Sequence, residues 1–274
     1  MKKKFKTLST VAITLSFLSA PAWADQLSDI KSKGTLVCGV LGAFEPFGFI
    51  DVASRATVGY DVDVCNAIAK HIGVKAEVKP VSIEARIPEL QQGRMDLLAA
   101  GLGYSPQRAE QVDFSNQYFV SPHKLIVKAS RGFKQPSDLE GKRVSFTKGG
   151  ITEGFVRSAV PSAKLTGYED TPTAFTALAQ NKVVGFSVAE VVARRLISKT
   201  GASASEYTIL EPAVGSEKWG LGVRKGEASM LAAVNDALEK MEASGEAQQI
   251  FDKWLGAGTM YKISRSFTIG PIQN

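Results

Sequence analysis

The chain of 274 residues contains few of the residues and motifs on which metal binding and catalysis most often depend. Its two histidines, His71 and His123, are not spaced as metal ligands, and Cys-x-x-Cys and His-Glu-x-x-His are absent, so we expect no metal site. Gly-x-Ser-x-Gly and the P-loop are absent too, and we expect neither an enzyme of those classes nor a cofactor. Beyond residue 24 no apolar run is long enough to span a bilayer, which argues against a membrane-tethered receptor.

Cysteine is almost as scarce, since only Cys38 and Cys65 are present. Cys38 falls in a predicted strand and Cys65 in a predicted helix, and we expect these two elements to touch. An oxidising compartment permits a disulfide, but the geometry of the pair cannot be read from the sequence. We favour two buried thiols as the simpler interpretation.

The N-terminus has the pattern of a secretory signal peptide. Four lysines among the first six residues precede an apolar stretch at Leu8–Leu18, which is too short to span a bilayer, and Ala22-Trp23-Ala24 is a small-x-small cleavage site. We therefore predict a signal peptide at residues 1–24, cleavage after Ala24 and a periplasmic mature protein. Cleavage lowers Lys+Arg from 33 to 29 against 27 Asp+Glu, so the mature net charge is about +2. No basic block or basic-aromatic stripe remains, and we expect no nucleic-acid partner.

Alternating strand and helix patterns predict two α/β units. The first contains Thr35–Val40, an aromatic loop at Phe44–Phe49, Tyr60–His71, Lys75–Val81, Glu84–Gln92 and Asp96–Ala100. The second contains Arg143–Phe146, Thr152–Val160, Lys164–Gly167, Thr171–Gln180, Val183–Ser187 and Val188–Ser198. Gln117–Lys128 leads out of the first unit and Trp219–Val223 returns to it, before helices at Ala228–Ala243 and Glu246–Leu255. This order predicts mainly parallel sheets with helices on their faces, and we expect residues 257–274 to form an extended tail on the body.

One stretch at the end of the first unit has the features of a small-anion site. The short apolar strand Met95–Leu98 is followed by Gly101 and Gly103, which leave the backbone open to a small molecule. Ser105 then begins a short helix, and Arg108 lies one turn into it, where its guanidinium can bind a carboxylate bidentately. The spacing alone is equally compatible with a tight turn followed by a solvated arginine.

The same stretch carries a family resemblance. Ser105-Pro106-Gln107-Arg108, followed by Val112-Asp113-Phe114-Ser115 and Tyr118, resembles a signature of bacterial extracellular solute-binding proteins of the polar amino-acid family. Further motifs occur in the order of that family: Pro46-Phe47-Gly48-Phe49, Gly59-Tyr60-Asp61-Val62-Asp63, Arg86-Ile87-Pro88-Glu89-Leu90, Gly93-Arg94-Met95-Asp96, Asp138-Leu139-Glu140-Gly141-Lys142 and Lys253-Trp254-Leu255-Gly256. The resemblance covers roughly residues 34 to 256, and glutamate/aspartate-binding members are the most similar.

The resemblance implies an α/β fold of the bilobed periplasmic-binding-protein type (type II), with two lobes joined by two hinge strands. Lobe one would comprise residues 25–120 and 220–274, and lobe two residues 121–219. The implied function is capture of a small polar, acidic amino acid by closure of the cleft, followed by delivery to an ABC permease in the inner membrane. We expect the protein to be a monomer.

The resemblance also implies ligand contacts in lobe one. Arg108 would bind the ligand α-carboxylate, assisted by the amide after Gly103 and by Ser105, while the Gly101 carbonyl would accept from the α-ammonium. Phe44 would stack on the ligand, unless it is an ordinary core residue. Arg86 would face the ligand side chain and favour a second carboxylate, unless it forms a surface ion pair with Glu84 or Glu89.

Lobe two would contribute the turn that contains Gly150 and Thr152, together with Thr171 and Ser187. Ala189 stands where acidic amino-acid binders often carry the aspartate that holds the ammonium. Either Glu190 or Asp170 replaces that aspartate, or the ligand has no α-ammonium.

Two other functions remain as alternatives. A cyclohexadienyl or arogenate dehydratase-like enzyme would use Glu153 or Glu190 as its general acid. A signalling ectodomain would need a separate membrane partner.

Overall fold

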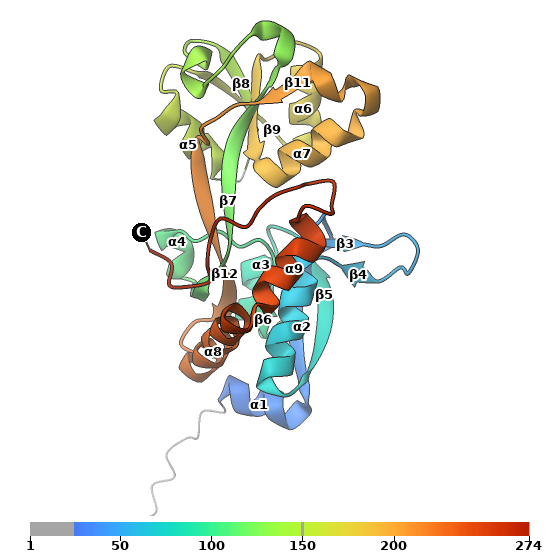
Figure 1. Ribbon diagram of the computed structural model, residues 1–274. Helices are drawn as coiled ribbons and strands as arrows, with labels where there is room; N and C mark the ends of the chain where they lie inside the picture. Colours follow the sequence, from blue (N-terminus) through green and yellow to red (C-terminus); the bar gives the residue numbers. More distant parts are fainter. Residues whose placement is uncertain (1–24, 149–150, 274) are drawn as a thin grey trace, which may run out of the picture.

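The computed structural model describes residues 25–148 and 151–273, and it shows two lobes joined by two long strands, β7 (Val112–Lys128) and β12 (Gly215–Arg224) (Figure 1). These strands pair antiparallel from Gly215 opposite His123 to Arg224 opposite Val112. One nine-stranded sheet therefore runs through both lobes in the order β5-β1-β6-β12-β7-β10-β8-β9, with β11 paired to β7. The predicted signal peptide, residues 1–24, and Gly150 of the predicted site lie outside the described residues.

The first lobe contains the α/β unit that the hydrophobic pattern predicts. Its elements are α1 (Gln26–Lys33), β1 (Thr35–Leu41), α2 (Tyr60–Ile72), β5 (Lys75–Val81), α3 (Arg86–Gln91), β6 (Leu97–Leu98), α4 (Pro106–Ala109), α8 (Ala228–Ser244) and α9 (Glu246–Leu255). Strand β1 pairs parallel with both β5 and β6. Helix α2 buries Val64, Cys65 and Ile68 against the lobe core, as the three-to-four spacing of its apolar residues requires. The short helix α1 was not predicted.

The aromatic loop expected at Phe44–Phe49 is a small antiparallel sheet instead. It consists of β2 (Ala43–Phe44), β3 (Gly48–Ile50) and β4 (Thr57–Val58), with a cis peptide bond between Glu45 and Pro46. Gly59 then enters α2 with φ at +142°, and a Cβ there would lie 2.1 Å from the carbonyl oxygen of Phe47. Glycine is therefore required where the small sheet meets α2.

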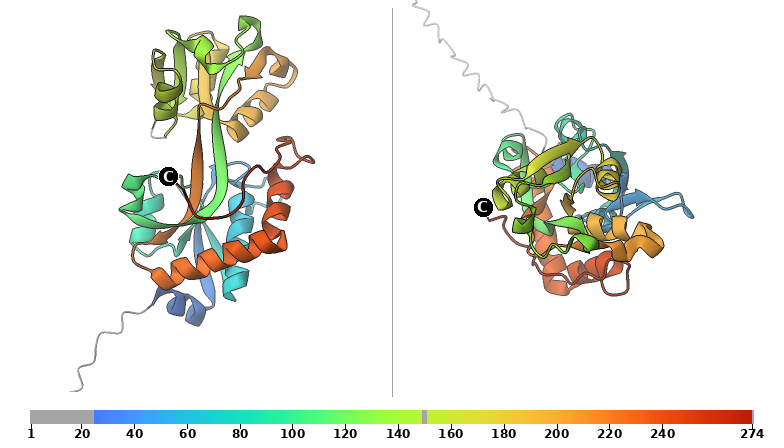
Figure 2. Two further views of the ribbon diagram at one scale, coloured as in Figure 1. Left: turned by 60° about the vertical axis from the view of Figure 1, so that its left-hand side comes forward. Right: turned by 90° about the horizontal axis from the view of Figure 1, so that it is seen from above.

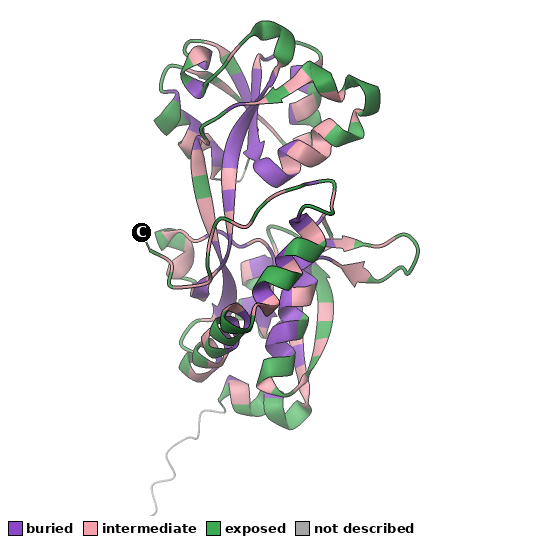
Figure 3. Ribbon diagram, viewed as in Figure 1, coloured by how far each residue is buried: buried purple, intermediate pink, exposed green. Residues whose placement is uncertain are grey.

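The second lobe follows the predicted order of elements with small shifts at their ends. It contains η1 (Ala129–Arg131), η2 (Pro136–Leu139), β8 (Arg143–Thr147), α5 (Thr152–Ala159), β9 (Lys164–Tyr168), α6 (Thr171–Ala179), β10 (Gly185–Ala189), α7 (Glu190–Lys199), η3 (Gly201–Glu206) and β11 (Tyr207–Ile209). Strands β8, β9 and β10 are parallel, whereas β10 is antiparallel to β7. Buried residues run through the strands of both lobes, and the outer faces of the helices are exposed (Figure 3).

The lobe boundaries at 120/121 and 219/220 remain a prediction, because both connecting strands run unbroken through them. The register of β12 against β7 shifts between Trp219 and Gly220 and again between Gly220 and Gly222. Such bulges locally bend and twist a strand. The irregular part of β12 therefore lies beside the predicted boundary.

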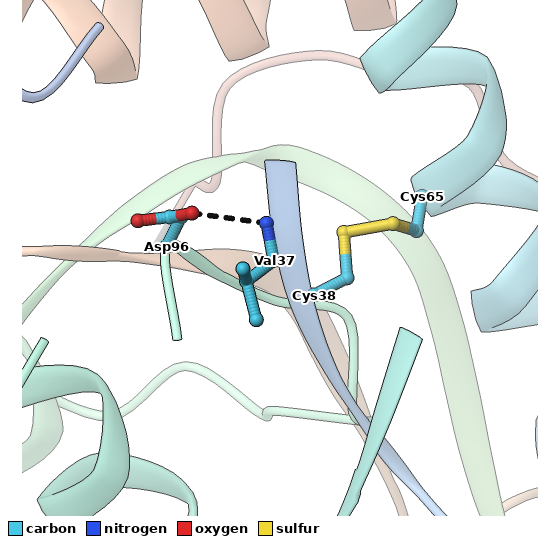
Figure 4. Close-up of a disulfide and its surroundings, with 4 residues drawn as sticks. All are labelled: Val37, Cys38, Cys65 and Asp96. Carbon is cyan, nitrogen blue, oxygen red and sulfur yellow. Dashed lines mark hydrogen bonds between the residues drawn. A yellow bond between two sulfur atoms is a disulfide. The ribbon is translucent and has the colours of Figure 1, made fainter. Parts of the chain in front are cut away.

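Cys38 on β1 and Cys65 on α2 form a disulfide, so our prediction of two free thiols is wrong (Figure 4). Both residues are fully buried, and their Cα atoms lie 6.4 Å apart. Packing of α2 against β1 directs the two side chains toward each other, which the sequence pattern did not determine. Next to this bridge, Val37 N donates to Asp96 Oδ2 at 2.9 Å and ties β1 to the segment before β6.

The segment after α9 lies extended along the first lobe and the connecting strands, as predicted (Figure 2). Gln117 N donates to Gly270 O at 2.8 Å, and Ile269 N donates to Glu242 Oε2 at 3.0 Å. The Phe267 ring packs against that of Phe119, with centroids 5.4 Å apart. None of the helices in 25–148 and 151–273 combines the length and apolarity needed to cross a membrane.

Candidate functional site

A cleft of about 430 Å³ lies between the two lobes. Its first-lobe wall includes the ends of β1 and β6, and its second-lobe wall includes the ends of β8 and β10 and the starts of α5 and α6. Seven of the predicted site residues line it: Phe44, Arg86, Gly101, Arg108, Thr152, Thr171 and Ser187. Gly103, Ser105 and Glu190 do not line it.

Gly101 forms the turn at the end of β6, where the chain meets the cleft. Its φ is +55°, and a Cβ there would lie 3.2 Å from the Phe44 ring. Its N–H donates to Asp61 Oδ2 at 3.1 Å, and Tyr118 Oη donates to Asp61 Oδ1 at 2.9 Å. Burial raises the pKa of Asp61 to about 7, although these hydrogen bonds favour the ionised form. The first α2 turn, β7 and the cleft wall are thus connected through one buried carboxyl group.

Arg86 is bound to backbone carbonyls beside the cleft, and its side chain is largely enclosed. Its Nη1 donates to Ala100 O at 2.8 Å and to Gly101 O at 3.1 Å, and its Nε donates to Ile83 O at 3.0 Å. The residue is only 7% exposed, and burial, aided by the charge of Arg108, lowers the pKa of Arg86. Because carbonyl oxygens do not neutralise a guanidinium, Arg86 still places a positive charge at the cleft wall.

The proposed surface pairing of Arg86 is not formed, since Glu89 pairs with Arg94 and Glu84 is exposed at the cleft rim. The Gly101 carbonyl, which the resemblance assigned to a ligand ammonium, accepts from Arg86 instead.

Arg108 occupies the first-lobe wall with part of its side chain exposed. Its Nη1 donates to Gly103 O at 2.8 Å, and its backbone N donates to Ser105 Oγ at 3.2 Å, which caps α4. The side chain remains 25% exposed. Gly103 and Ser105 therefore position Arg108 rather than line the cleft, and the guanidinium can receive a carboxylate from the cleft side.

Glu217 is a cleft residue that the sequence reasoning missed. It extends from β12, its side chain is 13% exposed, and its Oε1 lies 3.7 Å from Arg108 Nη1. Trp219 Nε1 donates to Glu217 Oε2 at 2.9 Å, and His123 Nε2 lies 3.7 Å from the same oxygen. Burial favours the neutral acid, but the His123 ring, the Trp219 N–H and the charge of Arg108 outweigh it and hold the pKa of Glu217 below its usual value.

The sequence did contain a signal that could have identified Glu217. In β12, Glu217 and Trp219 are two residues apart, so their side chains project to the same side of the strand, toward the cleft. Trp219 and Phe44 form an aromatic wall with centroids 5.9 Å apart. Phe44 thus lines the cleft and also packs against the core cluster of the first lobe.

Neither acid that was expected to replace an aspartate at Ala189 lies in this cleft. Glu190 accepts from Arg194 Nε at 2.9 Å and lies 3.1 Å from Lys124 Nζ, in a separate cavity near the C-terminal tail. Asp170 is exposed and caps α6 by accepting from Thr173 N at 2.7 Å. Glu190 is thus engaged by Arg194 one turn along α7 and by the distant Lys124, and Asp170 is engaged by the backbone of its own helix start.

The second-lobe wall offers hydroxyl groups. Thr152 Oγ1 is 3.0 Å from His123 Nδ1, and Thr171 Oγ1 is 3.2 Å from Thr147 Oγ1. Ser187 Oγ is buried and has no hydrogen-bond partner within 25–148 and 151–273. The cleft therefore presents hydroxyl groups opposite the charged pair Arg108–Glu217. In the same described ranges, no group of three or more acidic, His or Cys side chains has the arrangement of a metal site.

Comparisons with known proteins agree with this architecture. A family model described as bacterial extracellular solute-binding proteins, family 3, matches residues 36–257. The chain is 31% identical over 244 residues to the L-cystine-binding protein TcyJ of Escherichia coli (strain K12), covering 88% of this chain and 90% of that protein.

Two solved structures show the same bilobed fold. An ancestral arginine-binding protein bound to glutamine is 35% identical, with a TM-score of 0.68 and coverage of 81% of this chain and 98% of that one. The ancestral amino acid-binding protein AncCDT-1, described as a precursor of cyclohexadienyl dehydratase, is 28% identical, with a TM-score of 0.71 and coverage of 85% and 100%. The predicted α/β fold with two lobes is thereby confirmed.

Proposed function

Because the chain belongs to the bacterial extracellular solute-binding proteins, family 3, we propose that it is the amino-acid-binding component of an ATP-driven (ABC) importer. The names of similar proteins support an amino-acid ligand. One is an L-cystine-binding protein, and another is an ancestral arginine-binding protein whose structure was solved with bound glutamine. In this proposal the mature chain begins after Ala24, acts in the periplasm as a monomer and delivers its ligand to a membrane permease.

The placement of Arg108 at the cleft is the observation on which the proposal rests. Its guanidinium is fixed by the Gly103 carbonyl, and its side chain lines a cleft between two lobes and remains partly exposed. A ligand carboxylate that binds it would make charge-assisted hydrogen bonds, and hydroxyl groups such as that of Ser187 would reach it from the other lobe. Contacts from both lobes give the closed form a higher ligand affinity than the open form, which is the requirement for ligand-linked closure.

Within this function we propose that the ligand is an amino acid with an acidic side chain. The positive charge of Arg86 lies at the wall of the same cleft and would attract a second carboxylate. The experiment below separates this class from neutral and cationic amino acids.

A dehydratase-like activity is the second candidate, favoured by the likeness to a precursor of cyclohexadienyl dehydratase. Its expected general acids lie elsewhere, because Glu153 pairs with Arg157 on α5 and Glu190 faces another cavity. Glu217 does line the cleft, but its lowered pKa favours the ionised form, which cannot donate a proton. We therefore propose binding without catalysis, and water loss from arogenate or prephenate at high protein concentration would contradict that proposal.

The test is a thermal-shift titration of refolded, ligand-stripped mature protein with glutamate, aspartate, glutamine, arginine and cystine. A ligand at one hundred times its Kd stabilises the folded state by about 2.7 kcal/mol. We expect a clear rise with at least one amino acid, largest for glutamate or aspartate. Arg108→Ala should weaken that binding by at least about 100-fold, because it removes a charge-assisted contact from a partly buried site.

Arg131→Ala is the matched control, since Arg131 is exposed in the second lobe and does not line the cleft. It should bind as the wild type does. If no amino acid raises the melting temperature, the proposed function is wrong. If Arg108→Ala binds as tightly as wild type, the ligand site lies elsewhere.

A further inference from the structure

Three acidic residues line the cleft in the described part of the chain, and one of them differs from the others in being mostly enclosed. Glu84 and Glu169 are exposed at the rim, and Glu169 is paired with Lys148. Glu217 lies inside, with its side chain mostly enclosed next to Arg108. It is therefore the cleft carboxylate that a bound ligand would meet.

Gly103 makes room for the Glu217 carboxylate. A Cβ at position 103 would lie 1.8 Å from Glu217 Oε1 and 2.3 Å from its carboxyl carbon, far inside contact distance. Any side chain at this position would have to displace Glu217 or move the backbone. Because Gly103 has no side chain, Glu217 can lie beside Arg108. The Nη1 of this same arginine donates to the Gly103 carbonyl.

The two side chains form a site of two adjacent charges. Arg108 Nη1 and Glu217 Oε1 are 3.7 Å apart, which is a charge contact rather than a hydrogen bond, so both groups retain capacity for further hydrogen bonds. The Trp219 N–H donates to Glu217 Oε2 at 2.9 Å and fixes the carboxylate, and His123 Nε2 lies 3.7 Å from the same oxygen. An α-amino acid carries its carboxylate and its ammonium on one carbon. These two adjacent charges are complementary to the adjacent Arg108 guanidinium and Glu217 carboxylate.

A buried ammonium requires a counter-charge, because desolvation of an unpaired charge is costly. Ala189 provides none, and the carboxylates of Glu190 and Asp170 are engaged outside the cleft. On these contacts we propose that Glu217 binds the α-ammonium of the ligand, next to the α-carboxylate at Arg108. The cleft would thereby select amino acids over acids that lack the amino group. This inference rests on the proposed function.

The experiment compares each amino acid of the thermal-shift panel with its deaminated analogue by isothermal titration calorimetry. The analogues are glutarate, succinate, 5-amino-5-oxopentanoate, 5-guanidinopentanoate and 3,3′-dithiodipropionate. Wild-type protein should prefer the amino acid by about 50-fold, as expected for one hydrogen-bonded charge pair. In Glu217→Gln this ratio should fall below about 5-fold, because the amino acid binds more weakly while the analogue keeps its affinity.

Glu169→Gln is the matched control, because it neutralises a carboxylate of the same cleft that lies at the exposed rim. It should retain the wild-type ratio. Glu217→Asp keeps the charge on a shorter side chain and should restore part of the preference, which provides a second measurement should Glu217→Gln fold poorly.

A positioning role predicts a different result. If Glu217 only orients Arg108, the variant should lose amino acid and analogue equally and leave their ratio unchanged, which would overturn the inference. An unchanged amino-acid affinity in Glu217→Gln would overturn it as well. Failure of the wild type to bind any amino acid would instead contradict the proposed function.

Discussion

Replacement of Asp61 by asparagine should remove a pH-dependent loss of stability from the first lobe. The Asp61 carboxyl is fully buried beside the cleft and accepts from Gly101 N and Tyr118 Oη. An amide has nearly the same shape and can accept from Gly101 N while donating to Tyr118 Oη. The variant therefore keeps the local geometry but cannot ionise.

The magnitude follows from the pKa of Asp61, which burial raises from 3.8 to about 7. Below the pKa of the unfolded state, the carboxyl is protonated in both states and does not affect stability. As the pH rises from there toward the pKa of the folded state, the unfolded state gains stability by ionising, and the folded state is progressively destabilised relative to it. Above pH 7 the penalty levels off at about 4 kcal/mol, since each pKa unit corresponds to about 1.4 kcal/mol. Between pH 5 and pH 8 the change amounts to about 2 to 3 kcal/mol.

Urea unfolding of ligand-free wild type and Asp61→Asn at pH 5, 6, 7 and 8 measures this difference. We expect the variant to gain stability relative to wild type by about 2 to 3 kcal/mol across that range, with most of the gain below pH 7. Asp236→Asn, which removes an exposed carboxylate on α8, should run parallel to wild type. Parallel profiles for Asp61→Asn would refute the reasoning that this carboxyl ionises at a cost near neutral pH.

The remaining predictions concern a covalent and an ionic link. Reduction of the Cys38–Cys65 disulfide should lower the free energy of unfolding by about 3.5 kcal/mol, because it releases a chain segment with a sequence separation of 27. Urea midpoints with and without dithiothreitol measure it, and a Cys38→Ala/Cys65→Ala variant, which the reductant should not affect, is the control. Glu45 in the β2–β3 turn pairs with Arg195 on α7, across the two lobes. Glu45→Gln should weaken ligand binding about 2- to 5-fold and change unfolding stability by less than about 0.5 kcal/mol, and unchanged affinity would show that the pair does not favour closure.

The alternating hydrophobic periodicities were sufficient for most elements of the fold. Strand β5 (Lys75–Val81) has the predicted ends, and α2 begins at Tyr60 and ends one residue beyond the prediction. Both elements have long, regular patterns in which burial of one face is a local property of the sequence. The short elements β2, β3 and β4 were missed because two or three residues carry too little periodicity.

The candidate site was only partly predictable. The Ser-Pro helix start predicted the short helix that carries Arg108, but local spacing left a solvated arginine equally open, and the tertiary structure places Arg108 at the cleft. The partners of Arg86 are backbone carbonyls, which any sequence presents, so no pattern of residue types could identify them. The proposed binding roles of both arginines remain predictions.

The sequence by itself determined the two α/β units, the strands that connect them and the short helix that carries Arg108, because each depends on residues close together in the chain. Tertiary structure alone decided which distant residues meet. The disulfide depends on how α2 packs against β1, and the approach of Glu217 to Gly103 and Arg108 depends on the register of β12 in the sheet. A shift of that register by one residue would turn Glu217 to the opposite face, because successive side chains of a strand point to opposite sides.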